Sequence, residues 1–281
     1  MNKLLLLGVV VLIACKVDNS SLERKIDELN KKVDDLKTQV ARGGAGGQAP
    51  RARPAEPDRA KTYAMAVDGD PSEGPADAKV TLVKAYDYLC PFCEKVHDTM
   101  DDLRKKYGND LRIVYKQLVV HPPAATVGAL AACAAHKQGK FLDMDKVIWE
   151  KGYKGRQLQK DGAEGGGKCW ETDAGCPTVI GYAQELGLSQ DKFKADMKGE
   201  CQQLIQKDQR DLTAVGVGST PTFFINGRYL VGAMPMENFV ALIDEELQKA
   251  NEKIKAGTPQ ASYYQQAVLD KGLKQLEKPG Q

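Results

Sequence analysis

The apolar positions along the chain fall into blocks that predict a helix, a gap and then a folded domain. Residues 22–40 carry Leu, Ile or Val at alternating spacings of four and three, the heptad pattern of a coiled coil. Residues 42–61 are rich in Gly and then in Pro, so we expect a flexible linker there. The globular part then begins at residue 62, with an alternating stretch at 62–67 that predicts a first strand.

The remaining patterns of the globular part predict strands on either side of a long helical region. The β-branched runs Val80–Tyr86 and 111–120 predict buried strands. Residues from about 124 to 209 are expected to be mostly helical. A strand, an Asn-Gly turn and a second strand are expected at 217–230, and residues 236–247 predict an amphipathic helix. The fold class is therefore α/β.

Two cysteines separated by two residues, Cys90 and Cys93, lie where the first buried strand gives way to a helical pattern that ends near Gly108. At a helix N-terminus, unpaired N–H groups and the helix dipole favour a thiolate at Cys90. A thiolate is the attacking species in disulfide exchange. A second cysteine at this spacing can reach the first sulfur and resolve a mixed disulfide. The pattern thus indicates a redox-active Cys90–Cys93 pair.

Other uses of a cysteine pair fit this sequence less well. Covalent attachment of haem needs a His directly after the second cysteine, where this chain has Glu94. A zinc site needs a second ligand pair, and Cys169 and Cys176 are too widely spaced and have no neighbouring His. The alternative that stays open is a Cys90–Cys93 disulfide with only a structural role. We expect no metal and no organic cofactor, and the net charge of +2 implies no nucleic-acid partner.

The first residues predict a targeting segment. Lys3 precedes an apolar run, Leu4–Ile13, that is too short to span a bilayer as a stable helix. The run ends in Ala14-Cys15, which resembles the lipobox of bacterial lipoproteins. That resemblance implies removal of residues 1–14 and lipidation of Cys15, which would anchor the chain in the cell envelope. Lys16 is not the Asp that retains lipoproteins in the inner membrane of enteric bacteria, which favours the outer membrane. The alternative is an ordinary secretory signal with a chance cysteine.

The heptad segment at 22–40 lies within the expected membrane-proximal region 15–41. Leu occupies every d position and Ile or Val every a position from Leu22 onward, which favours a parallel two-stranded coiled coil. We expect a homo-oligomer through this segment, with a dimer favoured and a trimer open. The segment is only about 28 Å long, so it is marginal on its own. The alternative is a single amphipathic helix that lies on the membrane or on the body.

The globular part resembles the DsbA-like branch of the thioredoxin superfamily. The matching pieces are Asp87–Cys93, His121, Gln138–Phe141 and Gly218–Gly227, and the resemblance covers about residues 62–250. It implies a thioredoxin fold with a helical insertion at about 124–209 and leaves residues 251–281 as a C-terminal tail. It also implies an active site with Cys90, Pro91, Phe92, Cys93, Thr220 and Pro221, and a cis peptide bond at Thr220-Pro221 that exposes backbone groups to a substrate strand.

One active-site position departs from the family. Related proteins usually carry an acid six residues before the first active-site cysteine, thought to move protons for the buried cysteine, and here that residue is Lys84. An ammonium group near the sulfurs would favour a thiolate, whereas a side chain that extends to solvent would do nothing. Our hypothesis is that Lys84→Glu raises the pKa of Cys90. Thr220 is the residue type of the family's isomerases, whereas its strong oxidase often has an apolar residue there.

Four further cysteines allow three pairings. Cys169 and Cys176 flank a short loop, so a local bridge is expected. Cys133 and Cys201 lie on separate predicted helices, and relatives with cysteines in similar places imply a bridge between them. Both bridges are expected to be structural, in a compartment where disulfides persist.

The function implied by the resemblance is an extracytoplasmic thiol–disulfide oxidoreductase. Its substrates would be cysteine-containing secreted or envelope proteins, and a membrane redox partner would restore its working state. An oligomer that presents several active sites suits disulfide isomerisation, whereas a tethered monomeric oxidase fits the same sequence. The alternative from another class is a non-enzymatic envelope scaffold with a thioredoxin-like binding module.

Overall fold

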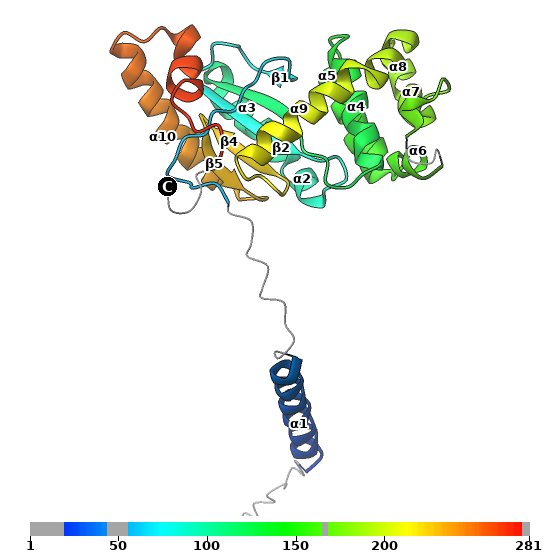
Figure 1. Ribbon diagram of the computed structural model, residues 1–281. Coiled ribbons are helices and arrows are strands. Elements are labelled where there is room, and N and C mark those ends of the chain that lie inside the picture. Colours follow the sequence, from blue (N-terminus) through cyan, green and yellow to red (C-terminus); the bar gives the residue numbers. More distant parts are fainter. Residues whose placement is uncertain (1–19, 44–55, 165–167, 277–281) are drawn as a thin grey trace, which may run out of the picture. The chain divides into compact units, whose positions relative to one another are not determined.

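The computed structural model describes residues 20–43, 56–164 and 168–276 (Figure 1). It divides into two compact units, Met1–Arg53 and Pro54–Gln281. The expected signal peptide 1–14, the lipidation site Cys15 and most of the linker 42–61 lie outside the described residues.

The first unit contains one described helix, α1 (Ser20–Gly43), which covers the predicted heptad segment. Ile26, Leu29 and Val33 are 49%, 61% and 47% exposed. An apolar stripe is therefore present on this helix, as the heptads predicted, whereas the coiled coil itself remains a prediction. Among the described helices, none is both long enough and apolar enough to cross a bilayer.

The second unit is built on a five-stranded mixed sheet in the order β1-β3-β2-β4-β5. The central strands β2 and β3 are parallel, and the other neighbouring pairs are antiparallel. Parallel strands need a crossover connection, which α2 (Pro91–Lys95) and α3 (His97–Tyr107) supply. The strands are β1 (Ser72–Glu73), β2 (Val80–Tyr86), β3 (Leu111–Gln117), β4 (Thr222–Ile225) and β5 (Arg228–Val231).

The α-helices of this unit fall into three groups. Helices α2 (Pro91–Lys95) and α3 (His97–Tyr107) connect β2 to β3, and α10 (Met236–Lys255) follows β5. The helical insertion lies between β3 and β4, as predicted. Its helices are α4 (Ala124–His136), α5 (Phe141–Val147), α6 (Leu158–Glu164), α7 (Pro177–Glu185), α8 (Gln190–Lys198) and α9 (Glu200–Ala214).

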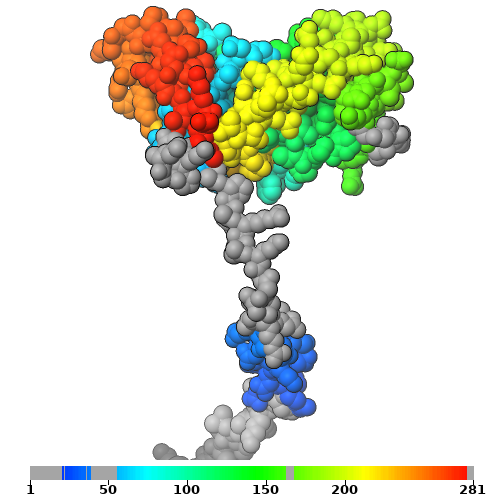
Figure 2. All heavy atoms as spheres, in the orientation of Figure 1, coloured from blue at the N-terminus to red at the C-terminus, as the bar shows by residue number. Residues whose placement is uncertain are grey.

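Short 3-10 and π segments complete the second unit. They are η1 (Gly108–Asp110), η2 (Ile148–Lys154), η3 (Cys169–Glu171), η4 (Gln260–Ser262) and η5 (Gln265–Leu269). Helix α9, yellow in Figure 2, runs across the visible face of the body from the insertion (green) toward the C-terminal segment (red).

Side chains of β2 alternate between two separate apolar clusters, because successive residues of a strand point to opposite faces. Leu82 and Tyr86 belong to the larger cluster, which includes residues of α3, α10 and the insertion. Val83 and Ala85 belong to a smaller cluster, with Leu212 at the end of α9. The sheet is therefore covered on both faces, which explains why every residue of β2 is buried.

The predicted Asn-Gly turn joins β4 to β5. Asn226 and Gly227 have φ values of 44° and 82°, the left-handed conformations that a two-residue hairpin turn requires. A Cβ atom on Gly227 would lie 2.6 Å from the carbonyl oxygen of Tyr63. Glycine is therefore needed both for the turn and for the close approach of the segment that enters the domain.

Three boundary expectations are wrong. Residues 62–67 do not form a strand: Thr62 and Tyr63 make single bridges to different partners, Arg228 and Leu273. The insertion continues to Ala214, because α9 extends beyond residue 209 and packs on β3. The boundary at residue 250 falls inside α10, and the tail 251–281 packs on the body as far as Leu276, whose N–H donates to the Ala214 carbonyl oxygen at 2.9 Å.

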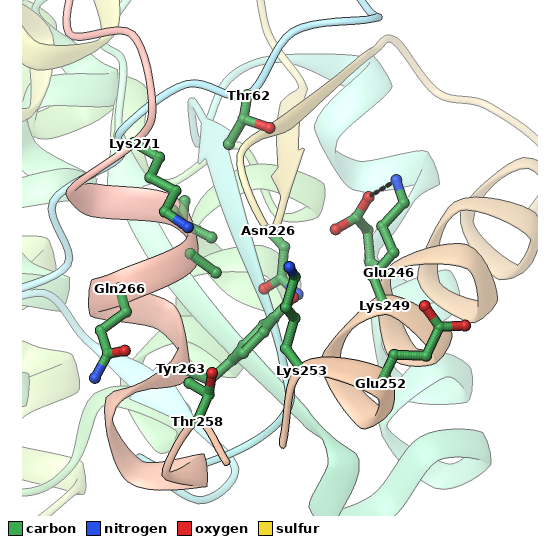
Figure 3. Close-up of a pocket in the computed structure, with 12 residues that line it drawn as sticks. Thr62, Asn226, Glu246, Lys249, Glu252, Lys253, Thr258, Tyr263, Gln266 and Lys271 are labelled. Carbon is green, nitrogen blue, oxygen red and sulfur yellow. Dashed lines mark hydrogen bonds and ion pairs between the residues drawn. The ribbon is translucent and has the colours of Figure 1, made fainter. Parts of the chain in front are cut away.

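A pocket of about 260 Å³ lies between α10 and the C-terminal segment (Figure 3). Asn226, which follows the end of β4, lines it, whereas Pro221 precedes the beginning of β4. A strand of four residues separates these ends by about 13 Å. The pocket is therefore at the opposite end of the strand from the predicted cysteine site.

Candidate active site

The predicted active-site motif begins at the end of β2, where Asp87 fixes the chain. Its buried carboxylate accepts the N–H of Leu89 at 2.7 Å and those of Val120 and His121 at 2.6 and 2.9 Å. His121 Nδ1 also lies 3.2 Å from this carboxylate. Asp87 therefore holds the loop before the cysteines against the loop after β3. Our sequence reasoning used Asp87 only as one end of the motif.

Cys90 is the residue before α2, and Pro91 is the first residue of that helix. Proline suits this position because its fixed φ fits a helix start and its missing N–H is not needed there. The structure places Cys90 Sγ 3.3 Å from the carbonyl oxygen of Thr220, and the Thr220-Pro221 peptide bond is cis. The two motifs singled out in the sequence thus meet at one point. Phe92 extends outward and is 53% exposed.

The pKa of Cys90 is lowered from the usual value to about 5. The largest cause is a hydrogen bond from the Cys93 thiol; the Thr220 side chain and the backbone N–H groups of Cys93 and Phe92 add to it, against the opposing effect of burial. These N–H groups belong to the first turn of α2, and that of Cys93 also donates to the Cys90 carbonyl oxygen at 3.0 Å. Cys90 is therefore a thiolate at neutral pH.

Cys93 has the opposite properties. Its side chain is fully buried, and burial raises its pKa strongly, with a further contribution from the hydrogen bond to Cys90. The nearby charge of Lys84 acts in the other direction. Neither sulfur is in a disulfide here. The pair therefore combines a nucleophile that is 4% exposed with a thiol that is fully buried.

Lys84 does not extend to solvent, so that alternative is wrong. The residue is 1% exposed, because β2 is covered on both faces. Its Nζ lies 4.9 Å from the centroid of the Tyr86 ring and 5.5 Å from that of Tyr115. Burial lowers the pKa of Lys84, while Asp145 and then Cys93 oppose that change. Of the two active-site cysteines, Cys93 is thus the one that interacts electrostatically with Lys84, whereas our hypothesis concerned the pKa of Cys90.

A buried polar network beside Lys84 was not anticipated from the sequence. Tyr86 donates to the Tyr88 hydroxyl at 2.9 Å, and Tyr88 donates to Asp145 at 2.6 Å. His97 Nε2 lies 3.4 Å from the other oxygen of Asp145. Asp145 comes from α5 in the insertion, 57 residues after Tyr88. The only available signal was an acidic residue within an otherwise apolar helix face.

The remaining four cysteines form Cys133–Cys201 and Cys169–Cys176, the two bridges expected above. The first joins α4 to α9, and the second closes a loop before α7. Among the described residues, the one group of three potential metal ligands is Asp161 with Cys169 and Cys176. Both of its sulfurs are engaged in the disulfide, so this cluster is not a metal site in this state.

The sequence profile of a family described as Thioredoxin matches residues 67–245, more than half of the chain. The chain belongs to the thioredoxin family. This confirms the predicted thioredoxin superfamily and the predicted fold class, a thioredoxin fold with a helical insertion.

Curated relatives of similar sequence are large proteins. The Na(+)/H(+) antiporter NhaA of Herminiimonas arsenicoxydans is 33% identical over 178 residues, which are 62% of this chain and 25% of the antiporter. Na(+)/H(+) antiporter NhaA 1 of Salinispora arenicola is 32% identical over 182 residues, 63% of this chain and 24% of the antiporter. The chain therefore spans about a quarter of the length of these relatives.

Solved structures with the same fold include DsbA-like proteins. Oxidised BdbD from Bacillus subtilis is 19% identical with a TM-score of 0.53, and the match covers 69% of this chain and all of BdbD (100%). Alpha-DsbA1 from Wolbachia pipientis is 16% identical with a TM-score of 0.54, covering 68% of this chain and 96% of that one. This likeness shows that the chain shares their fold.

Proposed function

We propose that this thioredoxin-family protein is a thiol–disulfide oxidoreductase that acts on secreted or envelope proteins. The observation that carries the proposal is the pairing of Cys90 and Cys93 at the start of α2. Cys90 has a pKa of about 5, and Cys93 is a fully buried thiol whose pKa is raised. Exchange requires a thiolate that attacks and a second thiol that resolves, and the pair supplies both.

In the reductive direction, the Cys90 thiolate attacks one sulfur of a substrate disulfide. A mixed disulfide forms, and the other substrate sulfur leaves as a thiolate. Cys93 then attacks Cys90 Sγ, which releases the second substrate sulfur and leaves the enzyme oxidised. When the same steps run in reverse, the oxidised enzyme transfers its disulfide to a substrate dithiol. The low pKa of Cys90 makes it a good leaving group and stabilises the reduced enzyme.

Isomerase activity is the finer proposal within this class. Its support is Thr220 next to Cys90 and the exposed apolar stripe on α1, which offers a surface for a second copy. Several active sites on one oligomer would keep a misfolded substrate within reach of repeated exchange. A membrane redox partner would return the pair to its working state.

An envelope location and a lipid anchor at Cys15 are part of this proposal. Two bridges formed in the folded domain are typical of proteins outside the cytosol, where thiols are not kept reduced. This chain matches only about a quarter of each antiporter, and ion transport is not part of this proposal.

Insulin reduction and refolding of scrambled ribonuclease test the proposal. The wild-type protein should accelerate both reactions, and Cys90→Ser should abolish both. Cys93→Ser should accumulate mixed disulfides with substrate, since nothing resolves them. Cys133→Ala/Cys201→Ala is the matched control, because it removes two cysteines outside the pair. Equal activity of wild type and Cys90→Ser would leave the non-enzymatic scaffold as the function.

A further inference from the structure

Two buried cysteines and one buried carboxylate meet in the helical insertion. Cys169 and Cys176 form the disulfide that closes the loop before α7, and Asp161 belongs to α6. One ligand atom of each residue, the two sulfurs and a carboxylate oxygen, lies within 4.8 Å of the other two. Cys176 is fully buried, and Cys169 and Asp161 are each 4% exposed. The sequence offered no second cysteine pair for zinc, but the fold brings a carboxylate to these two sulfurs.

Asp161 is held in place at the start of α7. One of its oxygens accepts the N–H of Thr178 at 3.0 Å, and the other accepts that of Val179 at 3.2 Å. A Cβ atom on Gly162 would lie 2.8 Å from the Cβ of Ala124, so α6 is packed tightly against α4. Within the described part of the chain, Asp161 forms no ion pair. A carboxylate oxygen can accept more than one bond, so each oxygen keeps a lone pair for a cation.

The loop between the two cysteines is held by hydrogen bonds that do not depend on the disulfide. The Cys169 carbonyl oxygen accepts from the N–H of Thr172 at 3.1 Å and from its hydroxyl at 2.8 Å. The N–H of Gly175 donates to the same hydroxyl at 3.1 Å. The Cys176 carbonyl oxygen accepts the N–H of Ile180 at 3.0 Å, and the Cα atoms of the two cysteines are 4.9 Å apart. Reduction should therefore leave both sulfurs close to each other and to the carboxylate.

A cavity of about 400 Å³ borders this cluster. Asp161 and Cys169 line it, together with Thr172 and Thr178. The cavity gives an ion access to the ligands and has room for water. Two thiolates, one carboxylate and a water suit Zn²⁺, which takes sulfur and oxygen ligands in a four-coordinate site. Mg²⁺ and Ca²⁺ prefer oxygen ligands alone.

We propose that reduction of the Cys169–Cys176 disulfide creates a zinc site, in which both thiolates and the Asp161 carboxylate bind one Zn²⁺ and water takes the fourth position. The ion supplies the positive charge that the buried carboxylate lacks. The disulfide and the zinc complex are alternative states of the same two sulfurs, so zinc occupancy follows the redox state of the loop. The inference concerns the insertion and goes beyond the exchange activity proposed for Cys90 and Cys93.

The conversion takes place in two steps, and its reductant is a dithiol. The two S–H bonds of the dithiol break as its own disulfide forms, and its two electrons and two protons convert Cys169–Cys176 to two thiols. Zn²⁺ then displaces one proton from each thiol, so two Zn–S bonds form and two protons go to solvent. Asp161 binds the ion through an oxygen lone pair. Reoxidation of the sulfurs releases the ion.

The full chain carrying Cys90→Ser and Cys93→Ser is the background for the test, because a reduced Cys-x-x-C pair can itself bind zinc. The protein is reduced with a phosphine, exposed to Zn²⁺ and desalted. Elemental analysis should find about one Zn²⁺ per reduced chain and none in the oxidised chain. Competition with a chromophoric chelator gives the affinity. Co²⁺ in place of Zn²⁺ should give thiolate-to-metal charge-transfer absorption, which reports sulfur ligands directly.

Three variants in this background identify the ligands. Cys169→Ser/Cys176→Ser should retain no zinc. Asp161→Asn keeps an oxygen that can accept an N–H of α7, and it should weaken zinc binding at least about tenfold. Cys133→Ala/Cys201→Ala is the matched control, because it removes the other disulfide of the insertion. It should bind zinc as tightly as the background protein does.

Absence of zinc from the reduced background protein would overturn the proposal, as would equal zinc retention by Cys169→Ser/Cys176→Ser. Equal affinity of Asp161→Asn would overturn the carboxylate as a ligand and with it the three-ligand site. Zinc should also raise the Tm of the reduced chain and leave that of the oxidised chain unchanged, since it binds only the reduced folded state. The background lacks the active-site cysteines, so failure of the zinc site is distinguishable from failure of the exchange function.

Discussion

The sulfur of Cys90 lies 3.3 Å from the carbonyl oxygen of Thr220, 130 residues further along the chain. The contact brings the start of α2 to the loop before β4. It also places the Thr220 side chain at the nucleophile. The Thr220 hydroxyl is buried and has no hydrogen-bond partner among the described residues. It is therefore free to donate to the Cys90 thiolate, in agreement with its effect on the pKa of Cys90.

Replacement of Thr220 by Val should raise the pKa of Cys90 from about 5 by about one unit, because a donor to the thiolate is lost. The pH dependence of the alkylation rate of Cys90 measures this. Thr222→Val is the matched control, since its hydroxyl donates to the Ser219 carbonyl oxygen at 2.8 Å. An equal shift in both variants would assign the effect to packing.

Lys116 forms a second buried charge cluster, on the face of the sheet opposite Lys84. Its ammonium lies 2.6 Å from Asp70 and 2.8 Å from Asp208, and all three side chains are buried. Two carboxyl groups thus share one cation. Burial, then the charge of Asp208, raises the pKa of Asp70 from 3.8 to about 7. One carboxyl of the cluster therefore carries a proton in weakly acidic solution.

Because of this cluster, we expect the free energy of unfolding to fall as the pH rises from about 4 to about 7. The folded protein retains the Asp70 proton over that range, whereas the unfolded chain has lost it, so stability falls as pH rises. Asp70→Asn should flatten this part of the curve, as measured by urea unfolding at several pH values. Parallel curves for variant and wild type would contradict the assignment.

Removal of the shared cation should have a larger effect. Lys116→Met leaves two buried carboxyl groups without a counter-charge, and it should lower the free energy of unfolding by about 3–5 kcal/mol at pH 7. Stability should partly recover at low pH, when both carboxyls are protonated. Lys105→Met, at an exposed ion pair on α3, is the control and should change stability by less than about 1 kcal/mol.

Local patterns predicted the elements that carry the cysteines, because the residues that indicate each element are contiguous in the sequence. The strand Val80–Tyr86 coincides with β2, and the Asn-Gly turn was placed correctly. The helix expected from Cys90 to Gly108 is interrupted at Val96, where α2 ends and α3 begins.

The polar network could not be predicted in the same way. Nothing near Tyr88 indicates that its hydroxyl bonds Asp145, because the insertion brings the two together only in the folded chain. Lys84 did carry a signal: it alternates with Leu82 and Tyr86 on one face of a largely apolar strand. That alternation did not decide whether its amine is buried or extends to solvent, and its neighbours depended on α3 and α5.

The two structural disulfides should differ in their effect on stability. Loop closure predicts a contribution of about 4 kcal/mol for Cys133–Cys201, which closes 68 residues, and about 2 kcal/mol for Cys169–Cys176, which closes seven. Double Ala variants of each pair, unfolded in urea, test the order. Both variants should keep the pKa of Cys90, because neither bridge touches the active site. A larger loss from the shorter loop would contradict the chain-entropy argument.

The apolar stripe on α1 should hold copies of the chain together. Leu29 is 61% exposed in the single chain, and Leu at a d position of a heptad repeat packs against a partner helix, so a partner is expected to cover it. Leu29→Lys should weaken self-association at least tenfold, about 1.4 kcal/mol, measured by sedimentation. Lys31→Ala, at an outer heptad position, is the control. Ribonuclease refolding should fall with the oligomer while insulin reduction per active site is unchanged. A monomeric wild type with full refolding activity would contradict the oligomeric isomerase and leave a tethered oxidase.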